Sequence, residues 1–233
     1  MKKILASIIA VVLAVSGLSV ISITANAATI FISGNYEYTV NSDDTVNIAG
    51  YKGIATDITI PSQILNKNVV KISANSFYNN STLTSVKIPN TIKVVGSMAF
   101  YGCKNLSSVT LPNTLTEIGY SAFNGTTALT TITIPKTVTK AGIDVFEDSG
   151  LKTATIENGA TTVADNLFSN AKNLTKVTIP NTVKKVGSMS FYHCEKLSSV
   201  ALPNTLTEIG YSAFNGTTAL TTITIPKTVT KAG

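Results

Sequence analysis

One cysteine in the chain has a histidine directly before it, which makes it a candidate thiol nucleophile. His193 is the only histidine, and Cys194 follows it. A catalytic thiol needs an imidazole within hydrogen-bond reach and a third group that orients the imidazole. Side chains of neighbouring residues in extended or turn segments usually point apart, and Gly102 stands at the matching position of an earlier copy of this segment. We therefore expect His193 to be a loop residue without a catalytic role.

Paired carboxylates could do acid–base chemistry, and Glu117 and Glu208 are the pair that recurs. Glycoside hydrolases need their two carboxyl groups about 5–9.5 Å apart. These glutamates lie four repeat units apart, which is roughly 19 Å if strands stack ~4.8 Å apart. The pairs Asp43-Asp44 and Glu147-Asp148 are typical of turns, and neither has the spacing of a Ca²⁺ loop. Zinc-ligand spacing, a phosphate loop and a nucleophile elbow are also missing from the sequence, so we expect no enzyme activity, metal or cofactor.

The two cysteines test whether a disulfide staples the chain. Cys103 and Cys194 hold the same position in units that lie four apart. A disulfide needs Cα atoms within about 7 Å, whereas stacking would hold these two roughly 19 Å apart. We expect free thiols that are buried as small hydrophobic side chains.

The elements that position these residues repeat about every 23 residues. Phenylalanine marks the period, with steps of 23, 23, 23, 22, 23 and 23 residues. The seven positions are Phe77, Phe100, Phe123, Phe146, Phe168, Phe191 and Phe214. A fixed period of this length predicts a solenoid, in which each unit buries its apolar face against its neighbours. A solenoid presents a long surface rather than a pocket, which favours binding over catalysis.

The unit that ends at Phe123 shows how one turn is built. Val109 and Leu111 alternate, so both point inward, and Pro112 ends the strand because it has no N–H to donate. Ala122-Phe123 is expected in a helical turn, with the phenylalanines stacked as an aromatic spine. A glycine recurs as Gly96, Gly119, Gly142, Gly187 and Gly210. It indicates either a positive-φ turn or a close backbone approach.

Charged residues repeat at one position of the unit. Glu117 and Lys140 stand on adjacent units, and so do Lys185, Glu208 and Lys231. They predict cross-strand ion pairs that contribute about 0.2–1 kcal/mol each.

The amino terminus has the pattern of a secretory signal. Basic Met1-Lys2-Lys3 is followed by an apolar run over 4–23 and by the small-residue cleavage site Ala25-Asn26-Ala27. We expect residues 1–27 to be a cleaved signal peptide, with no transmembrane segment afterwards. The run is long enough to span a bilayer, so a retained anchor is the alternative. The remainder has 16 Lys, no Arg and 12 acidic residues, and this scattered surplus argues against nucleic-acid binding.

The two ends of the repeat region differ. Tyr36–Val40 and Thr45–Ile48 flank an Asx-rich turn, which predicts a hairpin in an N-terminal cap region, 28–57. The solenoid then covers 58–233, with seven Phe-bearing units, an incomplete eighth, and a loop at Gln63 to Asn68. Residues 202–233 are identical to 111–142 and stop before the next expected Phe. We expect a fragment of a longer protein, with a natural rough end as the alternative.

Outward strand positions are the candidate partner-binding residues. They are Ser85, Lys87, Ser108, Thr110, Thr131, Thr133, Thr153, Thr155, Lys176 and Thr178. Lys87, Lys176 and Ala201 interrupt the threonine array, which argues against an ice-binding surface, and threonine is in any case a favourable exposed strand residue.

The segment Leu174 to Cys194 resembles the BspA-like leucine-rich repeats of bacterial surface proteins, with Val186 in place of Ile and Ser190 in place of Ala. The resemblance implies a leucine-rich-repeat solenoid: a β-strand and a short helical or irregular turn per unit, and no catalytic motif. Family members are described as adhesins. The unit at 151–173 departs most, with Glu157 for Pro, Ala164 for Gly and Leu167 for Ala, so its turn is expected to be distorted.

Together these observations predict an extracellular, secreted or cell-surface bacterial repeat protein. We expect a monomer that binds a protein on a host or microbial surface by repeated contacts along the strands. Two alternatives are a non-catalytic targeting module of a larger extracellular enzyme and a structural spacer of the envelope.

Overall fold

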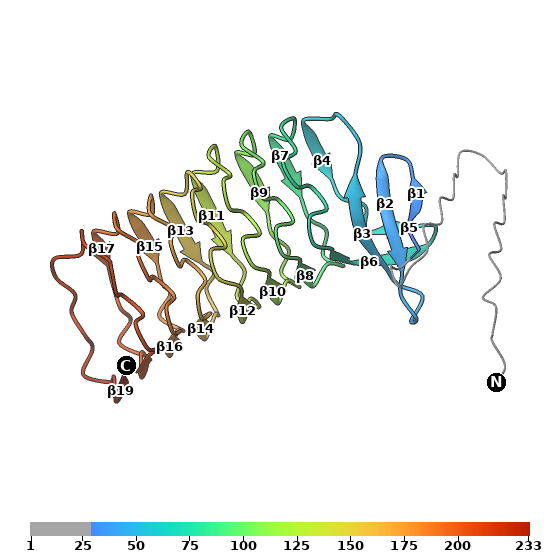
Figure 1. Ribbon diagram of the computed structural model, residues 1–233. Helices are drawn as coiled ribbons and strands as arrows, with labels where there is room; N and C mark the ends of the chain where they lie inside the picture. Colours follow the sequence, from blue (N-terminus) through green and yellow to red (C-terminus); the bar gives the residue numbers. More distant parts are fainter. Residues whose placement is uncertain (1–28) are drawn as a thin grey trace, which may run out of the picture.

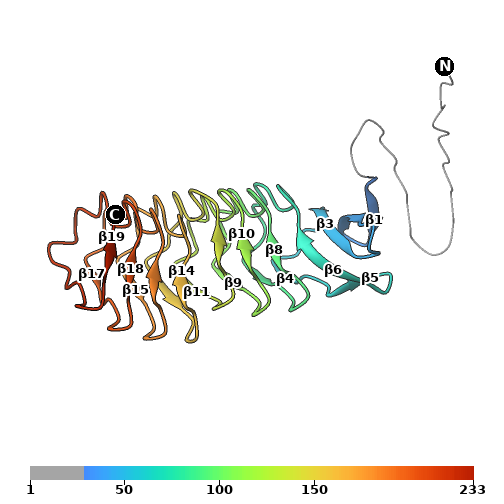
Figure 2. The same cartoon turned by 90° about the horizontal axis from the view of Figure 1, so that it is seen from below.

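The computed structural model describes residues 29–233, so the predicted signal peptide lies outside the described residues. The chain winds as a rod of stacked turns, with the cap strands at one end and β19 (Lys231–Ala232) at the other (Figures 1 and 2). Each turn has three sides. The strand face carries strands such as Ser85–Lys87, and the second face carries strands such as Val94–Val95. The turn face is the segment around each repeated phenylalanine, such as Phe100.

A three-stranded antiparallel meander covers the amino-terminal end of the rod. It consists of β1 (Phe31–Ser33), β2 (Tyr36–Val40) and β3 (Val46–Tyr51). The predicted hairpin is therefore confirmed, and β1 is an addition to it. Thr45 closes the hairpin turn by donating its backbone N–H to Asp43 Oδ1, 3.1 Å away. β3 then pairs in parallel with the first turn of the solenoid, which covers the strand edge that would otherwise be open.

The first turn contains a second hairpin where the sequence predicted only a loop. β5 (Gln63–Ile64) runs antiparallel to β6 (Lys67–Ile72). Leu65 and Asn66 connect them with φ values of 50° and 62°, as a tight two-residue hairpin requires.

The strand face consists of parallel strands in which more exposed residues alternate with buried or half-buried ones. Its first sheet contains β4 (Asp57–Thr59), β7 (Ser85–Lys87) and β9 (Ser108–Thr110). Its second sheet contains β11 (Thr131–Ile134), β13 (Thr153–Ile156), β15 (Lys176–Thr178) and β17 (Ser199–Val200). In β11 and β13 the exposed threonines alternate with buried Ile or Ala, because side chains of a strand point to opposite sides in turn.

After the six-residue β6, the second face is built from two-residue strands, and it is also split into two sheets. β6 is followed by β8 (Val94–Val95), β10 (Glu117–Ile118) and β12 (Lys140–Ala141). The other sheet contains β14 (Thr162–Val163), β16 (Lys185–Val186), β18 (Glu208–Ile209) and β19.

The turn face has no helix anywhere in residues 29–233, so the helical turn expected at Ala122-Phe123 is wrong. Each unit places two residues in the left-handed region, for example Ser121 with φ 49° and Gly125 with φ 70°. A right-handed helix cannot pass through such residues. The backbone N–H groups of this face instead donate to carbonyl oxygens of the next turn: Phe100 N–H donates to the Ala122 carbonyl oxygen at 2.8 Å.

The seven phenylalanines form the predicted aromatic spine. Adjacent ring centroids lie 4.9–5.8 Å apart with planes tilted by 4–23°. Such pairs contribute about 0.5–1.5 kcal/mol beyond the burial of their area. The spine therefore ties each turn to the next through the middle of the rod.

The recurring glycine serves a close backbone approach, and this settles the two alternatives left by the sequence. A Cβ on Gly96 would lie 2.7 Å from the Ala74 backbone N, and one on Gly187 would lie 2.6 Å from the Asp165 backbone N. These glycines do not have positive φ. Any larger residue would push adjacent turns apart.

We predict that Ser190→Ala stabilises the protein by about 1 kcal/mol, because Ser190 Oγ is buried without a hydrogen-bond partner. The residue at the same position of an earlier turn is Ala99, which is also fully buried. The free energy of unfolding in urea measures the effect.

The matched control is Ser76→Ala at the same position of the first turn. Ser76 Oγ lies 2.9 Å from both the Ile48 and the Ser73 carbonyl oxygens, which share its one proton, so its loss should destabilise by about 1 kcal/mol. A Ser190→Ala protein as unstable as the Ser76→Ala protein would contradict the prediction.

We predict that both cysteines resist thiol reagents in the folded state. Cys103 Sγ donates to the Phe77 carbonyl oxygen and Cys194 Sγ to the Phe168 carbonyl oxygen, each at 3.0 Å. Burial raises the pKa of each thiol to about 12, and the thiolate is the reactive form. The two thiols should be titrated with a chromogenic disulfide at pH 8, in buffer and in urea. Rapid reaction in buffer would show the prediction to be wrong.

The same pKa shift predicts alkaline sensitivity. A raised pKa in the folded state contributes stability below the ordinary thiol pKa and loses that contribution as the pH rises toward about 12. Thermal midpoints measured from pH 8 to 11 should therefore fall, and Cys103→Ala with Cys194→Ala should remove part of that fall.

Candidate binding surface

The thiol and histidine singled out in the sequence make separate contacts. The Cys194 thiol bonds to a backbone carbonyl of the preceding turn. His193 lies in the turn with φ 52°, and its ring packs edge-on against Tyr192 with centroids 4.3 Å apart. Within residues 29–233, no cluster of three or more His, Cys, Asp or Glu side chains could hold a metal ion.

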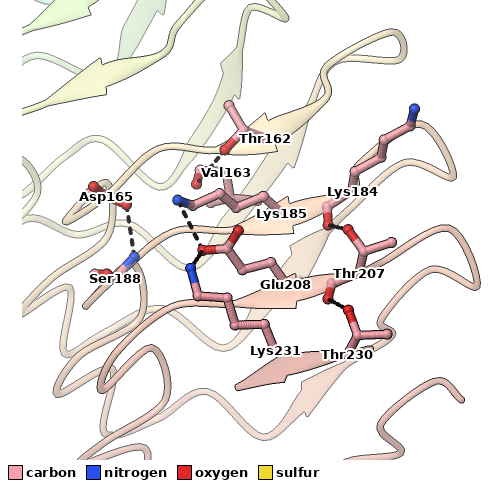
Figure 3. Close-up of polar contacts among 10 residues, drawn as sticks. All are labelled: Thr162, Val163, Asp165, Lys184, Lys185, Ser188, Thr207, Glu208, Thr230 and Lys231. Atoms are coloured by element: carbon pink, nitrogen blue, oxygen red, sulfur yellow. Dashed lines mark hydrogen bonds and ion pairs between the residues drawn. The ribbon is translucent and has the colours of Figure 1, made fainter. Parts of the chain in front are cut away.

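The recurrent glutamates Glu117 and Glu208 are half-buried residues of the second face, and Figure 3 shows Glu208 with its neighbours. Glu208 Oε1 lies 3.1 Å from Lys231 Nζ and 3.2 Å from Lys185 Nζ. Hydrogen bonds from Lys231 and Lys185 lower the pKa of this carboxyl. The predicted ladder is confirmed at these three residues.

The prediction is wrong for the other pair. Glu117 and Lys140 are register partners, but their charged groups form no ion pair. The neighbour of Glu117 on the preceding turn is Val94, where Glu208 has a lysine.

The two adjacent acidic pairs lie in turns, as the sequence indicated. Asp43 accepts hydrogen bonds from Thr45, which lower the pKa of its carboxyl. Glu147 Oε2 accepts a hydrogen bond from Asn124 Nδ2 at 2.9 Å. Burial, together with the charges of Asp144 and Asp148, raises the pKa of Glu147.

The structure places the ten predicted partner-binding residues on the strand face, where all but half-buried Ser85 are exposed. They form two columns in register. Thr131 pairs with Thr153, which pairs with Lys176, and Thr133 pairs with Thr155 in the same way. The columns therefore present hydroxyl groups at the spacing of adjacent strands, with lysines only at Lys87 and Lys176 among the ten.

The strand face is interrupted by a hollow of about 540 Å³ between its two sheets. β9 and β11 are neighbours, yet no backbone ladder joins them. Six predicted residues line the hollow: Ser108, Thr110, Thr131, Thr133, Thr153 and Thr155. Thr137 Oγ1, in the turn that starts with β11, is buried without a partner, whereas Thr114 Oγ1 at the same position one turn earlier donates to the Ile92 carbonyl oxygen at 2.9 Å. The two turns are thus less closely joined on this side.

Two further lining residues, Asn113 and Glu157, were missed by the sequence analysis. The sequence does distinguish Glu157, because it replaces the proline that follows each of the other strands of this face. Its Oε2 accepts the Lys136 backbone N–H at 3.0 Å, which fixes the carboxylate at one end of the hollow.

The same hollow recurs 91 residues later with a volume of about 410 Å³. It is lined by Ser199 and Thr222 where the first has Ser108 and Thr131, and Ala201 stands where the first has Thr110. Recurrence in both copies indicates that these sequences themselves favour the interruption.

Aromatic side chains form a smaller exposed feature on the turn face. Tyr78 and Tyr101 stack with ring centroids 5.1 Å apart, and Tyr78 is exposed. Their ring faces cover each other.

Over residues 29–233 there is also no helix with the length and apolar character needed to cross a bilayer.

Comparison with known proteins gives consistent results. A family model described as the BspA type leucine rich repeat region matches residues 54–175 and 161–233, with six copies. A leucine rich cell surface protein from Faecalibacterium prausnitzii A2-165 is 35% identical, with a TM-score of 0.68 over 85% of this chain and 55% of that one. This chain thus spans about half the length of that protein. No curated protein matches.

Two other solved structures are similar. The leucine rich repeat protein of T. pallidum is 25% identical, with a TM-score of 0.53 over 70% of this chain and 88% of that one. A leucine-rich repeat protein from Bacteroides ovatus ATCC 8483 is 24% identical, with a TM-score of 0.58 over 87% of this chain and 61% of that one; this similarity concerns the fold alone. The repeat, the solenoid and these matches together show that the chain belongs to the BspA-type leucine-rich repeat family.

Proposed function

We propose that this is a secreted or cell-surface bacterial protein that binds a protein on a host or microbial surface through its strand face, without catalysis. The observation that supports this most is the hydroxyl-lined hollow across β9, β11 and β13. The hollow is a concave region within an array of exposed side chains, and ligands preferentially bind in concave regions of a protein surface.

The chemistry of the face suits a protein partner. Each Ser or Thr hydroxyl both donates and accepts hydrogen bonds, so the columns can bond to the peptide groups of an extended segment. Glu157 is the only charged side chain among the lining residues of the first hollow. A second hollow on the same face would let one long partner bind at two places, which raises the overall affinity without any new contact type.

The location proposed for the protein draws on a relative and on the sequence. The F. prausnitzii protein, 35% identical over 85% of this chain, is a cell surface protein. The predicted signal peptide over residues 1–27 is compatible with export. The expected monomer is part of the same proposal and can be checked by light scattering.

The proposal predicts saturable binding to immobilised matrix proteins or to whole host or bacterial cells. Thr133→Glu with Thr155→Glu places two charges on the strand face at the hollow and should weaken binding roughly ten-fold or more, because the partner must then desolvate unpaired charges. Biolayer interferometry with the purified chain measures the dissociation constant.

The matched control carries Thr139→Glu and Thr161→Glu, two exposed threonines beside the second face. Binding by this control should equal that of the unmodified chain. Equal weakening in both variants would place the site elsewhere. No binding by folded, monomeric protein to any of these surfaces would overturn the proposed function.

A further inference from the structure

Backbone hydrogen bonds join successive turns of the rod on the strand face, the second face and the turn face, although β9 and β11 lack them on the strand face. On the turn face the pattern is three bonds per junction. From the turn of Phe123 to that of Phe146, they run from Ser121 N–H to Ile143 O, from Phe123 N–H to Val145 O, and from Gly125 N–H to Glu147 O, at 2.9–3.1 Å. The same three bonds recur at the other junctions between Phe-bearing turns, with one exception.

The exception is the junction between the turns of Phe146 and Phe168. Within residues 29–233, the backbone N–H groups of Asp144, Phe146 and Asp148 donate to no backbone carbonyl. On the second face, β12 and β14 meet at this junction but belong to separate sheets (Figure 1). Two of the three ladders are therefore missing at one place.

The third ladder is intact at this junction and is long. β11 and β13 pair over four residues, from Thr131↔Thr153 to Ile134↔Ile156, and Glu157 N–H extends the ladder by donating to the Ile134 carbonyl oxygen at 2.9 Å. On the open sides, side-chain contacts remain, such as Asn170 Nδ2 donating to Asp144 Oδ1 at 2.7 Å. The Phe146–Phe168 rings are the most separated and most tilted of the spine, at 5.8 Å and 23°.

The sequence of this unit supplies a cause. Glycine stands at the corner of the neighbouring closely stacked turns, where a Cβ on Gly142 would lie 2.8 Å from the Gly119 carbonyl carbon. At the next turn the corner residue is Ala164, which is buried. If this turn were as close to the preceding turn as the missing ladders require, the Ala164 methyl group would collide with the backbone of that turn. Real Cβ atoms do not come that close to a neighbouring backbone.

We propose that this junction is a joint, held open by the Ala164 methyl, at which the two halves of the rod swing apart about the β11–β13 ladder. A junction with one ladder has fewer hydrogen bonds to break than its neighbours, so it opens first. The joint depends on the fold alone and not on the proposed partner.

Hydrogen exchange resolved to single amides tests the joint in the purified chain. The amides of Asp144, Phe146 and Asp148 should exchange at least roughly ten-fold faster than those of Asn166, Phe168 and Asn170. The latter hold the same positions one turn later and are all bonded to the next turn. Equal protection of the two sets would overturn the proposal.

Two substitutions test the cause. Ala164→Gly should slow exchange at Asp144, Phe146 and Asp148, because the turns can then approach. Gly142→Ala is the converse change one turn earlier and should speed exchange at Ser121, Phe123 and Gly125. Unchanged exchange in the Ala164→Gly protein would overturn the role of the methyl group, whatever the stability of the Gly142→Ala protein.

The swinging motion can be measured with pairs of spin labels on introduced cysteines, because the native thiols are buried. Ile143→Cys with Tyr211→Cys spans three turns and the joint, whereas Ala74→Cys with Ile143→Cys spans three turns without it. All three positions are exposed. The first pair should give the broader distance distribution, and it should narrow when Ala164→Gly is added. Equal widths for the two pairs would show that the rod does not bend here.

Discussion

The stacking of each turn on the one before it is the interaction on which the rest of this structure depends. A unit of about 23 residues has too little apolar surface to form a core of its own. The phenylalanine rings, 4.9–5.8 Å apart, give each turn its buried neighbour. The other regular features, which are the corner glycines, the left-handed turn residues and the buried thiols, all fit one turn closely against the next.

Two identical segments in different surroundings show how far the neighbour decides burial. Residues 111–142 and 202–233 have the same sequence. Ile134 in the first is 1% exposed, and its counterpart Ile225 in the second is 47% exposed. The first segment has a described turn on both sides, and the second has one on a single side only. Local sequence therefore sets which side chains point inward, while the adjacent turn determines how much area they bury.

This division explains what could be predicted from the sequence. The solenoid, the spine, the alternation of the strands and the buried cysteines depend on the period alone, and all of them were predictable. The helical turn at Ala122-Phe123 was wrong because hydrophobic spacing does not reveal left-handed residues such as Ser121. The prediction of a Glu117–Lys140 ion pair was wrong, because sharing a register position does not bring two flexible side chains together.

The hollow could not be predicted, although its exposed residues could. It depends on which ladder is missing at a junction, and the repeat pattern does not specify that. Two successive junctions differ in this respect: β9 and β11 are unpaired on the strand face, while β12 and β14 are unpaired on the second face. Backbone ladders consequently join the turn of Phe146 to the preceding turn on its second and turn faces, and to the following turn on its strand face alone. The 22-residue step and Ala164 lie in this region. One small departure from the repeat thus changes how the rod is held together, and the concave part of the surface lies across the same turns.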